Sequence, residues 1–291
     1  MSLNSDSPHE LRISLGGSAR RAGLNLGGAW KRFARADSRP VPPWLRLCRL
    51  GGIELAALGL SAVLAAMVFL DAPLVHWARG LDPMLVLSFE AVTTLGKSDW
   101  SLVPLGILAV ALAGANGPGL RPRLRGALAA WTELLAYIVL VVAGSGLAVA
   151  TLKWLIGRAR PLHFDALGAF GFSPAAGHAS FASFPSGHAT TIFALAAALA
   201  LLAPKLRHAA FALAFWVALS RVAIGAHYAS DATAGALLAL GFALWARSLF
   251  ARKGLLFRVD AQGRYGLRAP RLLAEGRGLA VAALRGSIRH R

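Results

Sequence analysis

Three short groups of polar residues interrupt an otherwise apolar stretch of the chain. They are Lys153 with Arg160-Pro161, then Pro185-Ser186-Gly187-His188, then Ser220-Arg221 with His227 and Asp231. Charges at the ends of hydrophobic segments are costly unless they are paired. Within these groups three cations and two histidines share one carboxylate, that of Asp231. We therefore predict that the three groups bind an oxyanion, most simply a phosphate.

The cations have the chemistry of phosphate ligands. The planar guanidinium of arginine can donate two parallel charge-assisted hydrogen bonds to a phosphate. We therefore expect Arg160 and Arg221 to bind phosphate oxygens and Lys153 to add a point charge. Lys153 and Arg160 are seven residues apart, which is about two helical turns and predicts that both lie on one helix face.

Ser186 and Gly187 follow Pro185 and come directly before an apolar segment. The start of a helix offers unpaired N–H groups and a favourable dipole to an anion, and glycine lets a phosphate approach the backbone closely. We predict that both residues contact the phosphate. The alternative for Ser186-Gly187 is a simple helix cap.

The two histidines suit the two chemical roles of a phosphoryl transfer, the nucleophile and the general acid. His227 and Asp231 are four residues apart, so on a near-helical backbone the carboxylate can contact the imidazole. A carboxylate on one ring nitrogen fixes the tautomer and leaves the other nitrogen free to attack. We predict that His227 is the nucleophile and that His188 protonates the departing oxygen as general acid. The alternative is a buried His–Asp pair that only anchors a helix end.

Composition indicates an integral membrane protein. Hydrophobic residues make up 56% of the 291 residues and charged residues 15%, and a spanning helix needs about 20 mostly apolar residues. We predict an all-α bundle of six spans. These lie at 51–70, 101–115, 127–152, 186–203, 207–226 and 231–250. The stretch 71–100, which contains tryptophans and several charges, is predicted to be interfacial.

Small residues within these segments predict close contacts between helices. The candidates are Gly144, Gly146, Gly235 and Gly241.

The basic residues predict the orientation. Most of the 31 Lys and Arg residues fall on one side of the six-span model, which is then the cytoplasmic side. This gives a basic cytoplasmic segment at 1–50, a membrane domain at 51–250 and a basic cytoplasmic tail at 251–291. All three polar groups then lie at the outer ends of their spans. Because topology accounts for the net charge of +18, we expect no nucleic acid as a partner.

The loop 162–185 is predicted to lie over the site. It contains His163 and His178, which could bind a metal ion. Zinc sites are built from clustered Cys, His and acidic residues, and such a cluster is missing from the loop sequence, so we predict ordinary loop histidines and no metal site.

Taken together, the three groups resemble the signature of the type 2 phosphatidic acid phosphatase superfamily, which also includes vanadium haloperoxidases and bacterial acid phosphatases. Every signature position between Lys153 and Asp231 is filled without substitution. The resemblance implies a metal-independent helical enzyme without a cofactor. It also implies His227 as nucleophile with Asp231 as its partner, His188 as acid, and Lys153, Arg160, Ser186, Gly187 and Arg221 around the phosphate. The first 150 residues carry no motif.

These features predict a bacterial inner-membrane lipid phosphatase. It would hydrolyse a lipid phosphomonoester or diphosphate at the periplasmic leaflet through a phosphohistidine. The substrate would be a membrane lipid, either a phospholipid or an isoprenoid-lipid phosphate. Family members of this type act on lipid A phosphates, undecaprenyl diphosphate, phosphatidylglycerol phosphate or phosphatidic acid. A site at the outer face of the membrane favours lipid A or undecaprenyl diphosphate. The site residues do not distinguish between these substrates.

Three other functions stay open at this point. A lipid phosphotransferase would share the phosphohistidine and differ only in the acceptor. A haloperoxidase would hold vanadate in the same place, although those relatives are usually soluble. A carrier would bind a lipid phosphate without cleaving it. The sequence leaves the oligomeric state open.

Overall fold

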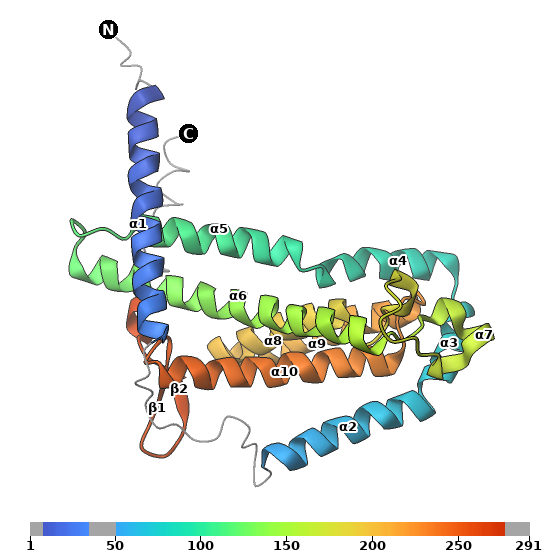
Figure 1. The fold of residues 1–291 in the computed structure, drawn as a ribbon. Coiled ribbons are helices and arrows are strands. Elements are labelled where there is room, and N and C mark those ends of the chain that lie inside the picture. The colour runs from blue at the N-terminus through green and yellow to red at the C-terminus, as the bar shows by residue number, and fades with distance from the viewer. Residues whose placement is uncertain (1–7, 35–50, 277–291) are drawn as a thin grey trace. The chain divides into compact units, whose positions relative to one another are not determined.

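The computed structural model describes residues 8–34 and 51–276, and the chain folds almost entirely into helices (Figure 1). The predicted all-α class is confirmed. The helices are α1 (Pro8–Ala34), α2 (Gly52–Phe69), α3 (Asp71–Arg79), α4 (Pro83–Thr93), α5 (Asp99–Ala115), α6 (Pro122–Ile156), α7 (Phe164–Leu167), α8 (Gly187–Leu202), α9 (Arg207–Ala223) and α10 (Ala229–Arg252). The sequence did not predict the small antiparallel sheet formed by β1 (Phe257–Val259) and β2 (Tyr265–Leu267).

The chain divides into two compact units. One comprises 42–102 and 138–248, and the other comprises 1–41, 103–137 and 249–291. We call them the site unit and the terminal unit, because every residue of the three polar groups belongs to the first. The predicted boundaries at 50 and 250 remain predictions, and parts of both terminal segments lie outside the described residues.

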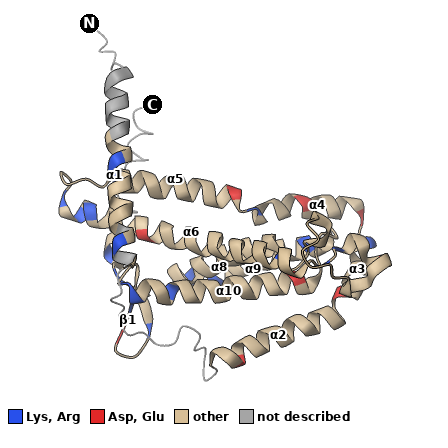
Figure 2. Ribbon diagram, viewed as in Figure 1, with Lys and Arg blue, Asp and Glu red and all other residues tan. Residues whose placement is uncertain are grey.

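Five helical stretches in the described part of the chain are long and apolar enough to cross a membrane. They are Gly52–Phe69, Pro83–Ala115, Pro122–Ile156, Pro204–Ala223 and Ala229–Arg252. The remaining predicted span, 186–203, corresponds to α8, which is apolar but only 16 residues long. It starts after Pro185-Ser186 and ends just before Pro204, and proline is poorly tolerated inside a helix. In Figure 2 the long helices are uncharged over most of their length.

The interfacial prediction for 71–100 was wrong in its second half. After the short helix α3, the apolar stretch that includes the second predicted span already begins at Pro83 and continues through α4, a 3-10 turn (Thr94–Gly96) and α5. Glu90, Lys97 and Asp99 are the only charged residues between Pro83 and Ala115. Three charges in so long an apolar stretch do not prevent it from spanning a membrane.

The core of the site unit lies between α8 and α9, with α4 packed on α9. Ile192 and Ala196 of α8 meet Ala214 and Val217 of α9 in one buried cluster. Ala189, Ala218 and Ala232 form a second cluster at the end of the helices that carries the polar groups. Alanines at these positions let the helices approach closely, which places the ends of α8, α9 and α10 side by side.

The predicted glycine contacts were half correct. A Cβ on Gly144 would lie 2.3 Å from Phe242, and one on Gly235 would lie 2.6 Å from the carbonyl oxygen of Ser186. These two glycines therefore permit close helix approach, as predicted. Around Gly146 and Gly241 no atom lies within 4 Å of such a Cβ, so for these two residues the prediction was wrong.

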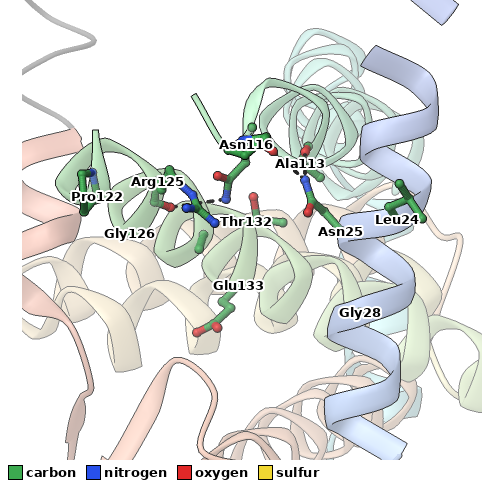
Figure 3. A pocket seen from close by; sticks show the side chains of 13 residues that line it. Leu24, Asn25, Gly28, Ala113, Asn116, Pro122, Arg125, Gly126, Thr132 and Glu133 are labelled. Atoms are coloured by element: carbon green, nitrogen blue, oxygen red, sulfur yellow. Dashed lines mark hydrogen bonds between the residues drawn. The ribbon is translucent and has the colours of Figure 1, made fainter. Parts of the chain in front are cut away.

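The terminal unit attaches α1 to the adjoining ends of α5 and α6. Asn25 donates to the carbonyl oxygens of Ala113 and Asn116 at 2.7 and 2.8 Å, and Asn116 donates to that of Arg125 (Figure 3). These residues surround a hollow of about 460 Å³ that also contains the Glu133 side chain. Asn25 thus satisfies carbonyl groups that the end of α5 leaves free.

Candidate active site

The three polar groups meet at one end of the helices of the site unit. Lys153 lies in the last turn of α6, His188 in the first turn of α8, Arg221 near the end of α9 and Asp231 in the first turn of α10. Because α8, α9 and α10 follow one another with short connections, their directions alternate. The start of α8, the end of α9 and the start of α10 therefore lie at the same level. The placement of the groups at a common end of their helices agrees with the sequence prediction.

The predicted site residues are close enough to interact electrostatically. Lys153 interacts with Arg160, Arg221 and Asp231, and His188 interacts with Arg221, His227 and Lys153. Lys153, Arg160 and Arg221 are therefore close enough to repel one another. Such a group of cations is stable only beside a compensating anion. The carboxylate of Asp231 cannot compensate them alone, because it is already bound to another cation, as described below.

A turn at Gly157 positions Arg160. Helix α6 ends at Ile156, and Gly157 has φ +61°, the left-handed conformation that commonly ends a helix. A Cβ there would lie 1.8 Å from the carbonyl oxygen of Ser173, so only glycine fits. Arg160 follows in extended conformation. The prediction that Lys153 and Arg160 share a helix face was therefore wrong, and the turn brings them together instead.

The guanidinium groups of Arg160 and Arg221 retain free donors. The Nε atoms of both are buried and have no hydrogen-bond partner among the described residues. Arg221 Nη1 donates to Thr93 Oγ1 at 2.9 Å, which orients its side chain. Buried donors are almost always satisfied in folded proteins, so the two Nε groups suit an external acceptor such as a phosphate oxygen. Lys153 Nζ donates to the carbonyl oxygen of Ala182.

Ser186 is the N-cap of α8. Its Oγ accepts a hydrogen bond from the N–H of Ala189 at 3.4 Å, and its own N–H donates to the carbonyl oxygen of Asp231 at 2.9 Å. The side chain thus acts as the cap that we considered as the alternative. Direct phosphate contacts from Ser186 and Gly187 remain a prediction, in which the first N–H groups of α8 would be the donors.

The side chain of His188 packs closely against Gly96, which is outside the signature motifs. A Cβ on Gly96, in the turn before α5, would lie 2.8 Å from Cβ of His188. The neighbouring Thr93 binds Arg221. The turn between α4 and α5 therefore packs against both the expected acid and one of the expected phosphate ligands.

His227 and Asp231 are in contact, as their spacing predicts. Nδ1 of the buried His227 lies 3.5 Å from Oδ2 of Asp231, which is longer than an ordinary hydrogen bond. Burial lowers the pKa of His227 to about 4, although Asp231 opposes the shift. The imidazole is therefore neutral at neutral pH, the form that can attack. Because Asp231 is on the Nδ1 side, Nε2 is the nitrogen that remains for phosphorus.

Asp231 belongs to a buried ionic network that the sequence did not predict. Arg158, fully buried, donates from Nη1 to Asp231 Oδ1 at 2.6 Å and from Nη2 to Asp71 Oδ2 at 2.7 Å. Ser230 donates to Asp71 from both its N–H and its hydroxyl. Ser183 and the N–H of Tyr228 donate to Asp231 Oδ2. One cation and two carboxylates leave the network with one negative charge, adjacent to His227.

The sequence contained one signal for this network. Arg158 is one of the few basic residues on the predicted outer side of the membrane, which marks it as a cation that needs a partner. The partner itself could not be predicted, because Asp71 precedes Arg158 by 87 residues. Ser183 and Ser230 carry no signal beyond their position next to the polar groups.

The two loop histidines have different surroundings. His163 stacks on Phe181 with ring centroids 5.3 Å apart, whereas His178 is exposed. Among residues 8–34 and 51–276 no group of three His, Cys, Asp or Glu residues could hold a metal ion. That the enzyme needs no metal remains a prediction.

Fold and site together define an integral membrane protein with a cation-rich histidine site at the ends of its helices. A family model described as the PAP2 superfamily matches residues 134–255. The chain is 41% identical over 205 residues to a lipid A 1-phosphatase of Rhizobium johnstonii, which covers 70% of this chain and 83% of that protein. It is likewise 41% identical over 206 residues to a lipid A 1-phosphatase of Rhizobium etli, covering 70% and 87%. The chain belongs to the PAP2 superfamily.

The resemblance inferred from the sequence is thereby confirmed, and the protein is a membrane phosphatase that hydrolyses a lipid phosphoester. Among solved structures it is similar to a transmembrane PAP2-type phosphatidylglycerolphosphate phosphatase from Bacillus subtilis. That match has a TM-score of 0.46 and 24% sequence identity, and it covers 67% of this chain and 92% of the other.

Proposed function

We propose that the enzyme removes the 1-phosphate of lipid A in a bacterial inner membrane, through a phosphohistidine on His227 and without a metal ion. The observation that carries this proposal is the 41% identity to two lipid A 1-phosphatases over about 70% of the chain. The site geometry supports it, because nucleophile, acid and cations gather where a lipid headgroup would lie.

The reaction then proceeds in two displacements. In the first, the lone pair of His227 Nε2 forms a bond to phosphorus, the bond from phosphorus to the lipid oxygen breaks, and that oxygen takes the proton of a protonated His188. In the second, His188 removes a proton from water, the water oxygen bonds to phosphorus, and the bond to Nε2 breaks. Arg160, Arg221 and Lys153 neutralise the non-bridging oxygens in both steps.

A purified preparation tests this function. Incubated with lipid A that carries both the 1- and the 4′-phosphate, the enzyme should release one equivalent of inorganic phosphate and leave the 4′-phosphate in place, as mass spectrometry of the product would measure. A chelator should leave the rate unchanged. Loss of the 4′-phosphate, preference for phosphatidic acid, or transfer of phosphate to another lipid in place of release would refute the assignment.

The proposed site faces the periplasm, with both termini in the cytoplasm. The positive-inside count supports this orientation. A cysteine at the exposed Ala179, in a Cys48→Ser background, should react with an impermeant maleimide in cells whose outer membrane alone has been opened. A cysteine at the exposed Lys205, at the opposite ends of α8 and α9, is the matched control and should react only after the inner membrane is broken. The reverse labelling pattern would invert the topology.

A further inference from the structure

Two hollows adjoin the catalytic histidines of the site unit, one for each. The first has a volume of about 600 Å³ and contains His188. We call it the α6 groove; its apolar lining includes Leu102, Val142, Ala143, Gly146, Leu147 and Ala150. The second, about 510 Å³, contains His227 and is called the α3 hollow; it is lined by Val75, Ala78, Arg79, Val86, Leu162 and Ile224, among others.

In-line displacement distinguishes the two hollows. The nucleophile and the leaving oxygen must lie on opposite sides of the phosphorus atom. A leaving oxygen that takes its proton from His188 therefore lies on the side of the α6 groove. The α3 hollow lies on the side of His227, where neither the leaving group nor the water of the second step can be in line. The reaction geometry thus favours the α6 groove for the lipid.

One face of α6 leads from the apolar part of the groove to the phosphate-binding cation. Ala143, Gly146, Leu147 and Ala150 follow the three- and four-residue spacing of a helix face, and Lys153 continues it. Ala143, Leu147 and Ala150 are exposed. From residue 143 to residue 153 the helix rises about 15 Å, roughly half of the ~30 Å hydrocarbon core. The face therefore has the depth of one leaflet.

The two ends of the groove differ in charge. Its polar end contains Lys97, Ser98 and Asp99 at the start of α5, together with Lys153 and His188. Apart from Thr191, the remainder is formed by aliphatic side chains and glycine. This distribution is complementary to a molecule with an anionic head and a hydrocarbon chain, because the cations outnumber the single carboxylate at the polar end.

We propose that the α6 groove binds the leaving lipid of the reaction, with an acyl chain along the Ala143–Ala150 face of α6 and the sugar or other headgroup beside Lys97 and His188. The proposal rests on the proposed function for its two-step chemistry. It assigns the chain-binding role to α6 and α5 and excludes the α3 hollow from it. The acyl chain passes through the open space over Gly146, where a Cβ would meet no atom within 4 Å.

A Gly146→Phe variant tests the proposal, with Gly241→Phe as its matched control. Both glycines are half-buried helix residues with open space at the Cβ position, but only Gly146 lines the groove. The phenyl ring should lower kcat/KM for lipid A by roughly tenfold or more, the loss expected when several buried methylenes are displaced. For p-nitrophenyl phosphate, which has no chain, kcat/KM should stay within about twofold. Gly241→Phe should leave both values within the same range.

Three results would overturn the groove assignment. One is an unchanged rate on lipid A in Gly146→Phe, and another is an equal loss on both substrates, which would indicate a misplaced site. The third is a lipid-selective loss in Val86→Trp, which fills the α3 hollow. If the wild type prefers another lipid phosphate, the proposed substrate fails, but the same comparison made with that lipid still decides the groove.

Discussion

Replacing His227 with Ala should abolish turnover of every phosphate substrate, lowering kcat by about four orders of magnitude or more. The reason is that the attacking nitrogen, Nε2 of the buried neutral imidazole, is lost with the side chain. The loss should be the same for lipid A and for p-nitrophenyl phosphate, measured as released phosphate. Near-normal turnover in this variant would end the nucleophile assignment and require a different mechanism of hydrolysis.

His188→Ala should behave differently, and the difference separates the two roles. Loss of a general acid costs about 10²- to 10⁴-fold with a poor leaving group such as a sugar oxygen. The p-nitrophenolate ion departs without a proton, so the first step should survive in this variant. The second step still needs His188 to deprotonate water. We therefore expect a burst of one equivalent of p-nitrophenolate from His188→Ala, followed by very slow turnover, and no burst from His227→Ala.

Asp71→Asn should lower kcat by roughly 10- to 100-fold. This loss is smaller than the ~10⁴-fold loss that is typical when the carboxylate of a catalytic triad is itself neutralised. Asp71 and Asp231 share the charge of Arg158. Without Asp71, Arg158 would neutralise Asp231 alone and leave no net charge to stabilise the phosphorylated imidazole. KM for the lipid should change little, because the residues expected to bind phosphate are untouched. A rise in KM with unchanged kcat would contradict this positioning role.

Arg158→Met gives the complementary result. It leaves two buried carboxylates unpaired, which should lower the free energy of unfolding by about 3–5 kcal/mol. Adding Asp71→Asn removes one of these charges, so the double variant should be more stable and more active than Arg158→Met alone. Asp165→Asn is the matched control: its pair with Arg79 has the same chemistry but is exposed, and such exposed pairs contribute little to stability. Additive effects of the two buried changes would refute the coupling.

Local sequence was sufficient for most of the helices and for grouping most of the predicted site residues. Long apolar stretches predicted the spanning helices, and the spacing of four between His227 and Asp231 predicted their contact, because both signals depend only on backbone periodicity. The same reasoning failed for Lys153 and Arg160, where Gly157 ends the helix between them. It also failed for Gly146 and Gly241, since composition does not say which face of a helix meets a neighbour.

Composition and local spacing are enough to predict a helical membrane protein with cations and histidines for phosphate chemistry. The packing of the helices decided which carboxylate binds which cation, because Asp71, Arg158 and Asp231 come from α3, the turn after α6 and α10. It also decided which hollow adjoins which histidine. Contacts between segments far apart along the chain depend on how the helices pack, and no local pattern records them.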